Sequence, residues 1–278
     1  MKDFRKKVVV ITGAGSGIGR ATALAFAREG AKLHLSDINR ERIETVAKEI
    51  RELGAEATPY VVDSTDRAAM AKFAEDVYAN AGRVDILHNN AGIAVAAPVE
   101  ELSLEHWERI ININLWGVIH GVHYFLPRMI AQGEGGHIVN TASGAGLIAM
   151  PLLAAYSATK FAIVGLSETM SIELTKYGIH TTALCPGIIN TNIVKDTVFV
   201  APAAEMAEKK DQAVNFYERY GATPDKVASD VLAAVRKKRS VQLSPFWQMV
   251  WPWLIKRLSV SLYQAIARMV GNRVTRKT

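Results

Sequence analysis

The sequence has little cysteine and no long apolar run, and each absence excludes a class of protein. A single cysteine in 278 residues cannot form an internal disulfide, so a disulfide-stapled secreted scaffold is excluded. The basic N-terminus leads directly into the segment VVVIT without an apolar targeting stretch, and we therefore expect a cytoplasmic protein. Because no uninterrupted stretch of about 20 apolar residues is present, a membrane-crossing helix is not expected.

The sequence also lacks a pattern of metal ligands. Its 7 histidines are scattered along the chain. His120 and His123 are three residues apart in a predicted helix, where packing or a subunit contact explains them better than a metal site. Cys185 follows an apolar strand, and we interpret it as a packed thiol rather than a nucleophile. The sequence therefore predicts no metal centre.

Acidic residues are absent from the C-terminal part of the chain. All 27 Asp and Glu residues lie at or before Asp230, whereas the segment from Arg236 onward carries 10 Lys and Arg residues. The body is therefore mildly acidic, and the net charge of +6 comes from the tail. Because the positive charge is confined to one end, we expect no nucleic-acid partner.

The body of the chain has the pattern of an α/β protein. Short apolar, β-branched runs alternate with longer stretches of helical period, which is typical of repeated βαβ units and a parallel sheet. We predict one catalytic domain over residues 1–240 and a basic, Trp-rich, amphipathic C-terminal extension over 241–278. The predicted strands lie near Lys7–Thr12, Lys32–Ser36, Thr58–Val62, Val84–His88, His137–Thr141 and Ile179–Leu184, with a weak seventh near Val241.

The residues just after the predicted strands are unusual. In an open parallel sheet, ligands bind in the crevice beyond the carboxyl ends of the strands, so these residues are expected to meet at one rim. In chain order they are Gly13 to Gly19, Asp37, Asp63-Ser64, Asn89-Asn90-Ala91-Gly92, Ser143 and Pro186-Gly187.

The first of these stretches is rich in glycine. Gly13, Gly15, Gly17 and Gly19, with Ser16 and Ile18 between them, lie between a predicted strand and a predicted helix. Glycines let the backbone approach a phosphate closely, and the helix N-terminus offers free N–H groups to the anion. The spacing is G-x-x-x-G-x-G rather than the common G-x-G-x-x-G, so the surrounding sequence decides its meaning.

Asp37 supports a dinucleotide site. It lies 18 residues beyond the last glycine, close to the position of an acid that hydrogen-bonds the adenosine ribose. The alternative is a helix N-cap, because a predicted helix starts near Asn39. A carboxylate would repel a 2′-phosphate, so NAD is favoured over NADP, although Arg40 and Arg42 follow closely.

Tyr156 and Lys160 have the spacing of a tuned general base. They are four residues apart in the predicted helix Ala154–Leu166, so both side chains emerge on one face. A neighbouring ammonium favours the phenolate, and we expect it to lower the pKa of Tyr156. Ser143 precedes Tyr156 by 13 residues and follows a strand, where its hydroxyl could hold the substrate oxygen.

Together these motifs resemble the short-chain dehydrogenase/reductase family. The resemblance covers about residues 5–240, in the family's order and at its spacing. It is carried by Thr12 to Gly19, Asn89-Asn90-Ala91-Gly92, Asn114 within Ile113-Asn114-Leu115, Ser143, Tyr156-x-x-x-Lys160, and Pro186-Gly187 with Thr191.

The resemblance implies a Rossmann-like, doubly wound parallel sheet of about seven strands and an NAD-dependent alcohol dehydrogenase. It implies that Lys160 also holds the nicotinamide ribose and that Asn114 positions a proton-relay water; helix bracing is the alternative for Asn114. Further cofactor contacts are implied for Asp63 and Ser64 near adenine, for Asn90, Ala91 and Gly92 along the groove, and for Pro186, Gly187, Ile188 and Thr191 near the carboxamide.

We hypothesise that Tyr156 takes the hydroxyl proton of a secondary alcohol while hydride leaves to NAD and Ser143 stabilises the developing carbonyl oxygen. Apolar residues from Leu147 to Leu153 and from Ile93 to Val99 predict a lipophilic pocket, for example for a steroid, a retinoid or a long-chain hydroxy compound. The segment from Asn192 to Tyr220 is expected to form a mobile lid. The alternatives are an NADPH-dependent carbonyl reductase and a nucleotide-sensing scaffold, but the scaffold would be marked by a broken Ser, Tyr or Lys.

The C-terminal extension departs from the family pattern. It contains Trp247, Trp251 and Trp253 and then an amphipathic stripe next to cations. Such a segment suits a helix lying on an anionic membrane surface, and the alternative is an arm that packs on the protein or on a neighbouring subunit. The family pairs subunits through two long helices, here around Ser103–Ala131 and Pro151–Tyr177, so we expect a homodimer or homotetramer.

Overall fold

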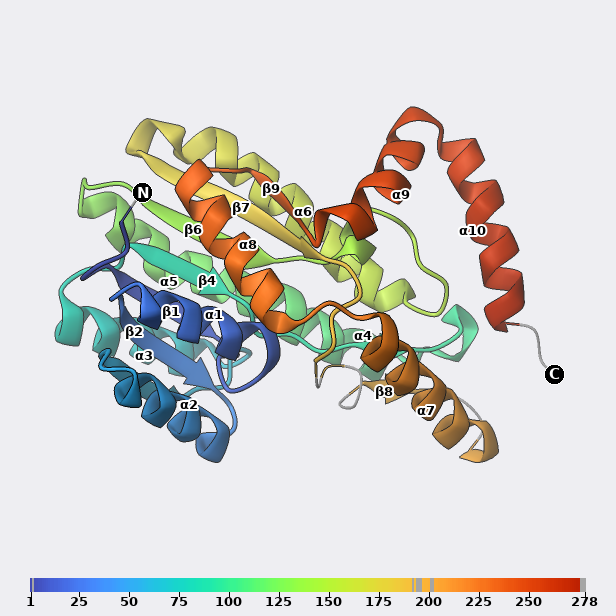
Figure 1. Ribbon diagram of the computed structural model, residues 1–278, viewed down its shortest axis with the longest axis horizontal. Helices are drawn as coiled ribbons and strands as arrows, with labels where there is room; N and C mark the ends of the chain where they lie inside the picture. The colour runs from blue at the N-terminus through green and yellow to red at the C-terminus, as the bar shows by residue number, and fades with distance from the viewer. Residues whose placement is uncertain (2, 192, 194–196, 201–202, 276–278) are drawn as a thin grey trace.

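The structure, a computed structural model, is built around one parallel sheet of seven strands (Figure 1). It describes residues 1, 3–191, 193, 197–200 and 203–275. The strands follow the order β3-β2-β1-β4-β6-β7-β9. The predicted doubly wound α/β fold is confirmed. The strands are β1 Val8–Thr12, β2 Lys32–Asp37, β3 Ala57–Val61, β4 Ile86–Asn89, β6 Gly136–Thr141, β7 Ile179–Pro186 and β9 Val241–Ser244.

The central strand β1 shows why the sheet is covered on both faces. All five of its residues are buried. Val9 and Ile11 pack into one apolar cluster, whereas Val8 and Val10 pack into another on the opposite face. Side chains alternate along a strand, so a continuous apolar run such as VVVIT requires helices on both sides.

Two layers of helices supply that cover. On one face, α1 (Gly17–Arg28), α2 (Arg40–Glu52) and α8 (Pro224–Lys237) bury side chains such as Phe26, Ile43 and Val231. On the other face, α3 (Arg67–Ala81), α5 (Gly117–Ala131) and α6 (Ala154–Glu173) bury Phe73 and Phe125. The carboxyl ends of the strands are left to the connecting loops, which is where the candidate residues lie.

The caps of two helices bear on the sequence predictions. Thr223 caps α8 by accepting a hydrogen bond from the N–H of Lys226, and Pro224 is the first helical residue, as the Thr-Pro pair indicates. Helix α2 is capped by Asn39, whose side chain accepts from the N–H of Arg42. Asp37 is therefore not the N-cap of α2.

A smaller layer lies beyond the main sheet. Strand β5 (Val95–Ala96) pairs in parallel with β8 (Val198–Phe199), and α7 (Ala203–Tyr220) follows. Residues 192, 194–196 and 201–202 of the predicted lid lie outside the described residues. Much of the rest of that segment is helical rather than loop. Helix α4 (Leu104–Ile111) runs into α5 through a π-helical turn, Asn112–Trp116.

The C-terminal extension begins later than the predicted boundary at residue 240. Strand β9 pairs with β7, so it belongs to the main sheet, and the extension starts with α9 (Phe246–Leu258) followed by α10 (Val260–Thr275). These two helices project at the right edge of the view, beyond the ends of β7 and β9 (Figure 1). Within the described part of the chain, no helix is long and apolar enough to span a membrane.

Candidate active site

The glycine loop between β1 and α1 is packed too closely for side chains. Gly13 has a φ of 63°, which favours glycine, and a Cβ there would lie 2.7 Å from the Cα of Ala91. A Cβ on Gly19 would collide with the carbonyl oxygen of Gly13 and lie 2.6 Å from Nδ2 of Asn90. The bare backbone therefore forms the floor of the crevice above β1 and β4.

Asp37 stands at the edge of this loop. Its Oδ2 accepts a hydrogen bond from the N–H of Gly15 at 2.9 Å, and its Oδ1 accepts from the N–H of Asn39 at 2.9 Å. A cavity of about 420 Å³ opens beside it. The cavity is lined by Gly15, Arg20, Asn39, Glu41, Arg42, Thr45 and Val46. This polar hollow, with a carboxylate at its edge, fits the adenosine half of a dinucleotide.

The first turn of α1 is open to an anion. Ser16 occupies the N-cap, and among the described residues its side chain makes no capping hydrogen bond. Ile18 is partly buried behind it. Across the crevice, a Cβ on Gly17 would lie 3.3 Å from Cγ2 of Thr191. The glycine loop and the segment after β7 therefore face each other, with free amides between them for a pyrophosphate.

Asn90 supports the glycine loop from below. Its Nδ2 donates to the carbonyl oxygens of Thr12 and Gly13 at 3.1 and 3.0 Å. Thr12 also bonds this segment, because its Oγ1 accepts hydrogen bonds from the N–H groups of Asn90 and Ala91. Asn90 thus ties the ends of β1 and β4 together and holds the loop in place.

Asp63 and Ser64 lie at the same sheet edge as Asp37. The N–H of Val62 donates to the carbonyl oxygen of Asp37 at 3.0 Å, which places the turn after β3 beside β2. Oδ1 of Asp63 accepts from Thr65, and the carbonyl oxygen of Ser64 contacts Nδ1 of His120 at 2.9 Å. The turn is therefore fixed by its own hydrogen bonds, next to the region expected to receive adenine.

Lys160 and Tyr156 converge on the other half of the crevice. Lys160 is 3% exposed, and its Nζ donates to the carbonyl oxygen of Thr141 at 2.8 Å. The same Nζ lies 5.5 Å from the centroid of the Tyr156 ring and 3.5 Å from the place where a Cβ on Gly92 would stand. The Tyr156-Lys160 pair of α6, the end of β6 at Thr141 and the segment after β4 at Gly92 therefore meet at one place.

The electrostatics of this pair differ from the prediction. Burial raises the pKa of Tyr156 to about 12, and Ser143 offsets part of that rise through a hydrogen bond. Burial likewise lowers the pKa of Lys160 to about 8. The expectation that Lys160 lowers the pKa of Tyr156 is therefore wrong for the protein alone, because loss of hydration disfavours both charged forms.

Asn114 is fully buried and held on both sides. Its Oδ1 accepts from the N–H of Ile93 at 2.8 Å, and its Nδ2 donates to the carbonyl oxygen of Ile93 at 3.0 Å and to Oγ1 of Thr159 at 3.3 Å. The side chain therefore braces the segment after β4 against α6, which is the alternative interpretation of this residue. It lies in the π-helical turn between α4 and α5.

The surroundings of Tyr156 are apolar, but the residues differ in part from those predicted. Tyr156 packs into a cluster with Val95 and Ile110. The partly buried members of that cluster are Ile93, Leu102, Trp107, Ile111, Val198 and Val200. Leu147 and Ile148, by contrast, are buried in the core with Met249. Among the described residues of the predicted pocket wall, Ile93 and Val95 thus belong to the cluster around the phenol, whereas Leu147 and Ile148 do not.

Two residues near the site are absent from the sequence predictions. Tyr217 of α7 is close enough to raise the pKa of Tyr156 further. Gln248 of α9 accepts a hydrogen bond from the N–H of Ile188 at 2.9 Å through its Oε1. The apolar spacing of Val214 and Tyr217 could have indicated an inward face of α7. For Gln248 the sequence carries no signal, because its partner is 60 residues away.

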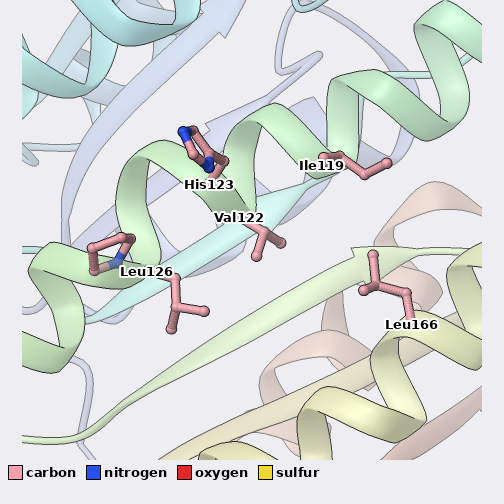
Figure 2. A pocket seen from close by; sticks show the side chains of 6 residues that line it. Ile119, Val122, His123, Leu126 and Leu166 are labelled. Atoms are coloured by element: carbon pink, nitrogen blue, oxygen red, sulfur yellow. The ribbon is translucent and has the colours of Figure 1, made fainter.

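A second hollow lies away from the crevice, on the outer surface of α5 and α6. It has a volume of about 330 Å³ and is almost entirely apolar. Figure 2 shows Ile119, Val122 and Leu126 of α5 with Leu166 of α6 around it. His123 also lines this hollow, which fits its interpretation as a packing or contact residue. Within the described residues, no group of three or more His, Cys, Asp or Glu could hold a metal ion.

Comparisons with known proteins agree with this geometry. The family model described as short chain dehydrogenase matches residues 7–198. The probable oxidoreductase EphD of Mycobacterium tuberculosis is 41% identical over 242 residues, which cover 86% of this chain and 41% of that protein. The uncharacterized oxidoreductase Lin0452 of Listeria innocua is 37% identical over 245 residues, covering 87% of this chain and 96% of the relative.

A solved structure extends the likeness over nearly the whole chain. The short chain dehydrogenase/reductase of Burkholderia phymatum, crystallised in complex with NAD, has a TM-score of 0.87 and 32% identity. The match covers 94% of this chain and 96% of that one. Since this chain spans less than half of EphD, the comparison with EphD concerns one region of a longer protein.

Proposed function

The chain belongs to the short-chain dehydrogenase family, and on that premise we propose that it is an NAD-dependent oxidoreductase acting on a hydrophobic secondary alcohol or its ketone. The observation that carries the proposal is the convergence of Tyr156, Lys160 and Gly92 at the end of the glycine-floored crevice. The NAD complex of the Burkholderia phymatum relative supports the choice of cofactor.

The residues present fit a dinucleotide along its whole length. Asp37 and the cavity beside it would hold the adenosine ribose, and the first turn of α1 would hold the pyrophosphate. Lys160 and Thr191 would meet the nicotinamide end. When bound, NAD supplies the nicotinamide that accepts or returns the hydride.

The proton of the substrate hydroxyl is transferred to and from a residue of the chain. In oxidation, the phenolate oxygen of Tyr156 takes the hydroxyl proton of the alcohol, the C–H bond gives up its electron pair as hydride, and the C–O bond becomes a carbonyl. Ser143 donates a hydrogen bond to the developing carbonyl oxygen. In reduction, the phenol returns its proton to the ketone oxygen. Because burial raises the pKa of Tyr156 to about 12, the phenol is protonated at neutral pH and is ready to act as the acid.

An apolar substrate suits the neighbourhood of the phenol. The walls beside Tyr156 come from three elements that close over it: the segment after β4, helix α4 with Trp107, and strand β8 with Val198. A steroid, a retinoid or a long-chain hydroxy compound would bury apolar area against these walls, at roughly 25 cal/mol per Å². The Asn114 side chain would keep the wall after β4 in position, since it bonds the N–H and the carbonyl oxygen of Ile93.

The first experiment is a screen of hydrophobic alcohols and ketones with NAD and NADH, measuring the absorbance of the reduced nicotinamide. Tyr156→Phe should lower kcat/KM by about 100- to 10 000-fold, the usual contribution of general acid–base catalysis, while the affinity for NADH changes little. The control is Tyr177→Phe, because that side chain is 40% exposed in the short turn Leu174–Tyr177 that follows α6. Retained turnover in Tyr156→Phe would refute the assignment.

An NADPH-dependent carbonyl reductase is the second candidate. The observation that favours it is Arg42, which lines the cavity beside Asp37 and could face a 2′-phosphate. Fluorescence titration with NADH and NADPH separates the two candidates. Tighter binding of NADPH would overturn our interpretation of Asp37.

We propose that two copies of the chain associate through α5 and α6, in a homodimer or a homotetramer. Besides the apolar hollow, the outer surfaces of α4 to α6 expose Leu104, Trp116 and Ile172 at 75%, 39% and 77%. Exposed apolar patches of this kind mark contact sites. Val122→Glu in the hollow should reduce the molecular mass measured by light scattering, and an unchanged mass would place the interface elsewhere.

We also propose that α9 and α10 touch an anionic membrane surface. Trp247, Trp251 and Leu258 of α9 are 66%, 68% and 86% exposed and lie on one side of the helix. In α10, Leu262 and Met269 are 54% and 62% exposed. The segment carries several cations and no acid. Exposed aromatic side chains beside cations are typical of helices that lie in the interface plane of a bilayer.

Liposome flotation tests this contact. The protein should float with vesicles containing phosphatidylserine and not with purely zwitterionic ones, and the double variant Trp247→Ser, Trp251→Ser should stay at the bottom. The control is Leu53→Ser with Val61→Ser, which removes apolar side chains that are 49% and 44% exposed on the opposite end of the sheet. Equal flotation of the two double variants would contradict the proposal.

A further inference from the structure

The inner face of α9 touches the two loops that carry the reacting half of the site. Gln248 reaches the segment after β7, where its Oε1 accepts the N–H of Ile188 at 2.9 Å. Gly187 is so close that a Cβ on it would lie 2.6 Å from the same Oε1. The helix therefore approaches this segment without any intervening layer.

Met249, the next residue, fills the space between the two loops. It is 6% exposed. A Cβ on Gly144, the residue after Ser143, would lie 2.6 Å from its Sδ, and a Cβ on Gly187 would lie 3.2 Å from the same atom. One methionine side chain therefore packs directly against both glycines, in van der Waals contact with the serine loop and with the segment after β7.

Other contacts of the extension reach the same serine loop. Nζ of Lys256 donates to the carbonyl oxygen of Leu147 at 2.7 Å, and the hydroxyl of Tyr263 on α10 donates to the carbonyl oxygen of Ala149. Nε2 of Gln248 lies 3.4 Å from the carbonyl oxygen of Tyr220, the last residue of α7. The extension therefore contacts the loop after β6, the segment after β7 and the end of α7.

We propose that α9 is a positioning element for the reaction, in which Gln248 fixes the backbone of Ile188 and Met249 sets the distance between the Ser143 loop and the Pro186–Ile188 segment. This inference rests on the proposed function, since Ser143 and Ile188 matter to catalysis only if the crevice binds NAD and substrate. Gln248 and Met249 contact the segment after β7 and the Ser143 loop, and they act on the reaction through these two segments.

The physical argument is the need of the Ile188 N–H for an acceptor, because only the carbonyl side of this residue is held by the neighbouring chain: the carbonyl oxygen of Ile188 accepts the N–H of Ala222 at 2.9 Å, beside the bridge between Ile189 and Ala222. The end of β7 has β9 as its neighbour on the outer side, and β9 stops at Ser244, whose carbonyl oxygen accepts the N–H of Gly187 at 2.8 Å. Ile188 lies one residue beyond the last ladder bond, so its N–H needs an acceptor from outside the sheet. Ile188 is partly buried, and an N–H that loses contact with water without gaining a partner is unfavourable; Gln248 supplies the acceptor.

The test compares two variants of Gln248, one without and one with an acceptor oxygen. Gln248→Met keeps the length of the side chain and removes the acceptor, whereas Gln248→Glu keeps an acceptor oxygen. Gln248→Met should raise the KM for NAD by about 3- to 10-fold, the factor expected from one net hydrogen bond, with kcat changed less than about 2-fold. Gln248→Glu should restore most of the affinity. Gln264→Ala, at an exposed position of α10, is the matched control.

Amide hydrogen exchange of the protein without cofactor provides a second readout. Gln248→Met should speed exchange at Ile188 by about 5-fold or more, and Met249→Ala should speed it over 144–148. Met269→Ala, which removes a methionine that is 62% exposed, should leave both segments unchanged.

The outcomes separate the two proposals. If the wild-type protein binds no NAD, the proposed function fails and the inference fails with it. If the wild type binds NAD but exchange at Ile188 and the KM of Gln248→Met match the wild type, only the positioning role of α9 is overturned. If Gln248→Met and Gln248→Glu lose affinity equally, the acceptor oxygen is not the reason, and the inference is again overturned.

Discussion

The two halves of the crevice are built in different ways. On the nucleotide side, meaning the β1–α1 loop with Asp37, the surface consists mainly of backbone, because Gly13 and Gly19 leave no room for a Cβ. On the reacting side, meaning Ser143, Tyr156 and Lys160, the surface consists of side chains, and burial shifts the pKa values of Tyr156 and Lys160. The first half offers a ligand a close approach to the backbone, and the second offers it buried ionisable groups.

The difference determines which changes each half tolerates. A backbone surface is disturbed by any added atom, whereas a buried ionisable group is disturbed by loss of its partners or by a change in pH. The two halves also differ in which parts of the chain hold them in place. The nucleotide side is held by neighbours within the first ninety residues, such as Asn90, whereas the reacting side also depends on α9 near the other end of the chain.

The largest effect is expected from one methyl group on the nucleotide side. In Gly19→Ala, the added carbon would collide with the carbonyl oxygen of Gly13 and approach Nδ2 of Asn90. We expect NADH binding, measured by fluorescence titration, to weaken by more than about 1000-fold. Gly165→Ala in α6 is the control, since a Cβ there has open space within 4 Å. That variant should be more stable by about 0.5–1 kcal/mol. Normal NADH binding in Gly19→Ala would show that the loop can open.

A smaller effect, and one that depends on pH, is expected on the reacting side. Lys160 has an ordinary pKa of 10.5 that burial lowers to about 8 in the folded protein. Between these two values the unfolded chain holds the proton and the folded protein does not, so this group makes the free energy of unfolding rise with pH. At 1.36 kcal/mol per pKa unit, the rise amounts to about 3 kcal/mol between pH 8 and pH 10.5.

Lys160→Met removes this contribution. The difference in unfolding free energy between the wild type and Lys160→Met, from urea denaturation, should therefore shift in favour of the wild type as the pH rises through that window. Lys237→Met, at an exposed position of α8, is the matched control. A pH-independent difference for Lys160→Met would mean that Lys160 keeps its ordinary pKa in the folded protein.

The smallest effect concerns the carboxylate at the edge of the nucleotide side. Asp37→Ala removes the acceptor for the N–H of Gly15 and the proposed partner of the ribose. We expect NADH to bind about 10-fold more weakly, and the ratio of NADPH to NADH affinity to rise, because the repulsion of a 2′-phosphate is relieved. Asp211→Ala, on the exposed side of α7, controls for net charge. An unchanged ratio would indicate that Arg42, rather than Asp37, decides the preference.

Much of the fold and of the nucleotide side could be predicted from the sequence. The short apolar runs predicted the bounds of six strands of the main sheet to within two residues and placed a seventh near Val241, and the Thr-Pro pair predicted the start of α8. These signals are local, since they depend on side-chain period and on caps. The two-residue strands β5 and β8 were missed, because a single parallel pair of that length has no periodicity to detect.

The reacting side was predicted less completely. Spacing correctly places Tyr156 and Lys160 on one helix, but it gives the wrong direction for the pKa of Tyr156, since burial is a property of the packed molecule. Leu147 and Ile148 were predicted to line the substrate pocket because they are apolar, but in the structure they are buried in the core. They are covered by Met249, about a hundred residues later, and hydrophobicity alone does not distinguish a pocket wall from a core.

The sequence by itself determined the parallel sheet, the glycine loop, the acid after β2 and the residue types available for proton transfer, since each follows from a short run of neighbouring residues. Only the tertiary structure decided how those residues are hydrated and what supports them. It placed the inner face of α9 against Gly144 and Ile188, and it buried Lys160 and partly buried Tyr156. Both results come from contacts between segments far apart in the chain, and such contacts form only when the whole core closes.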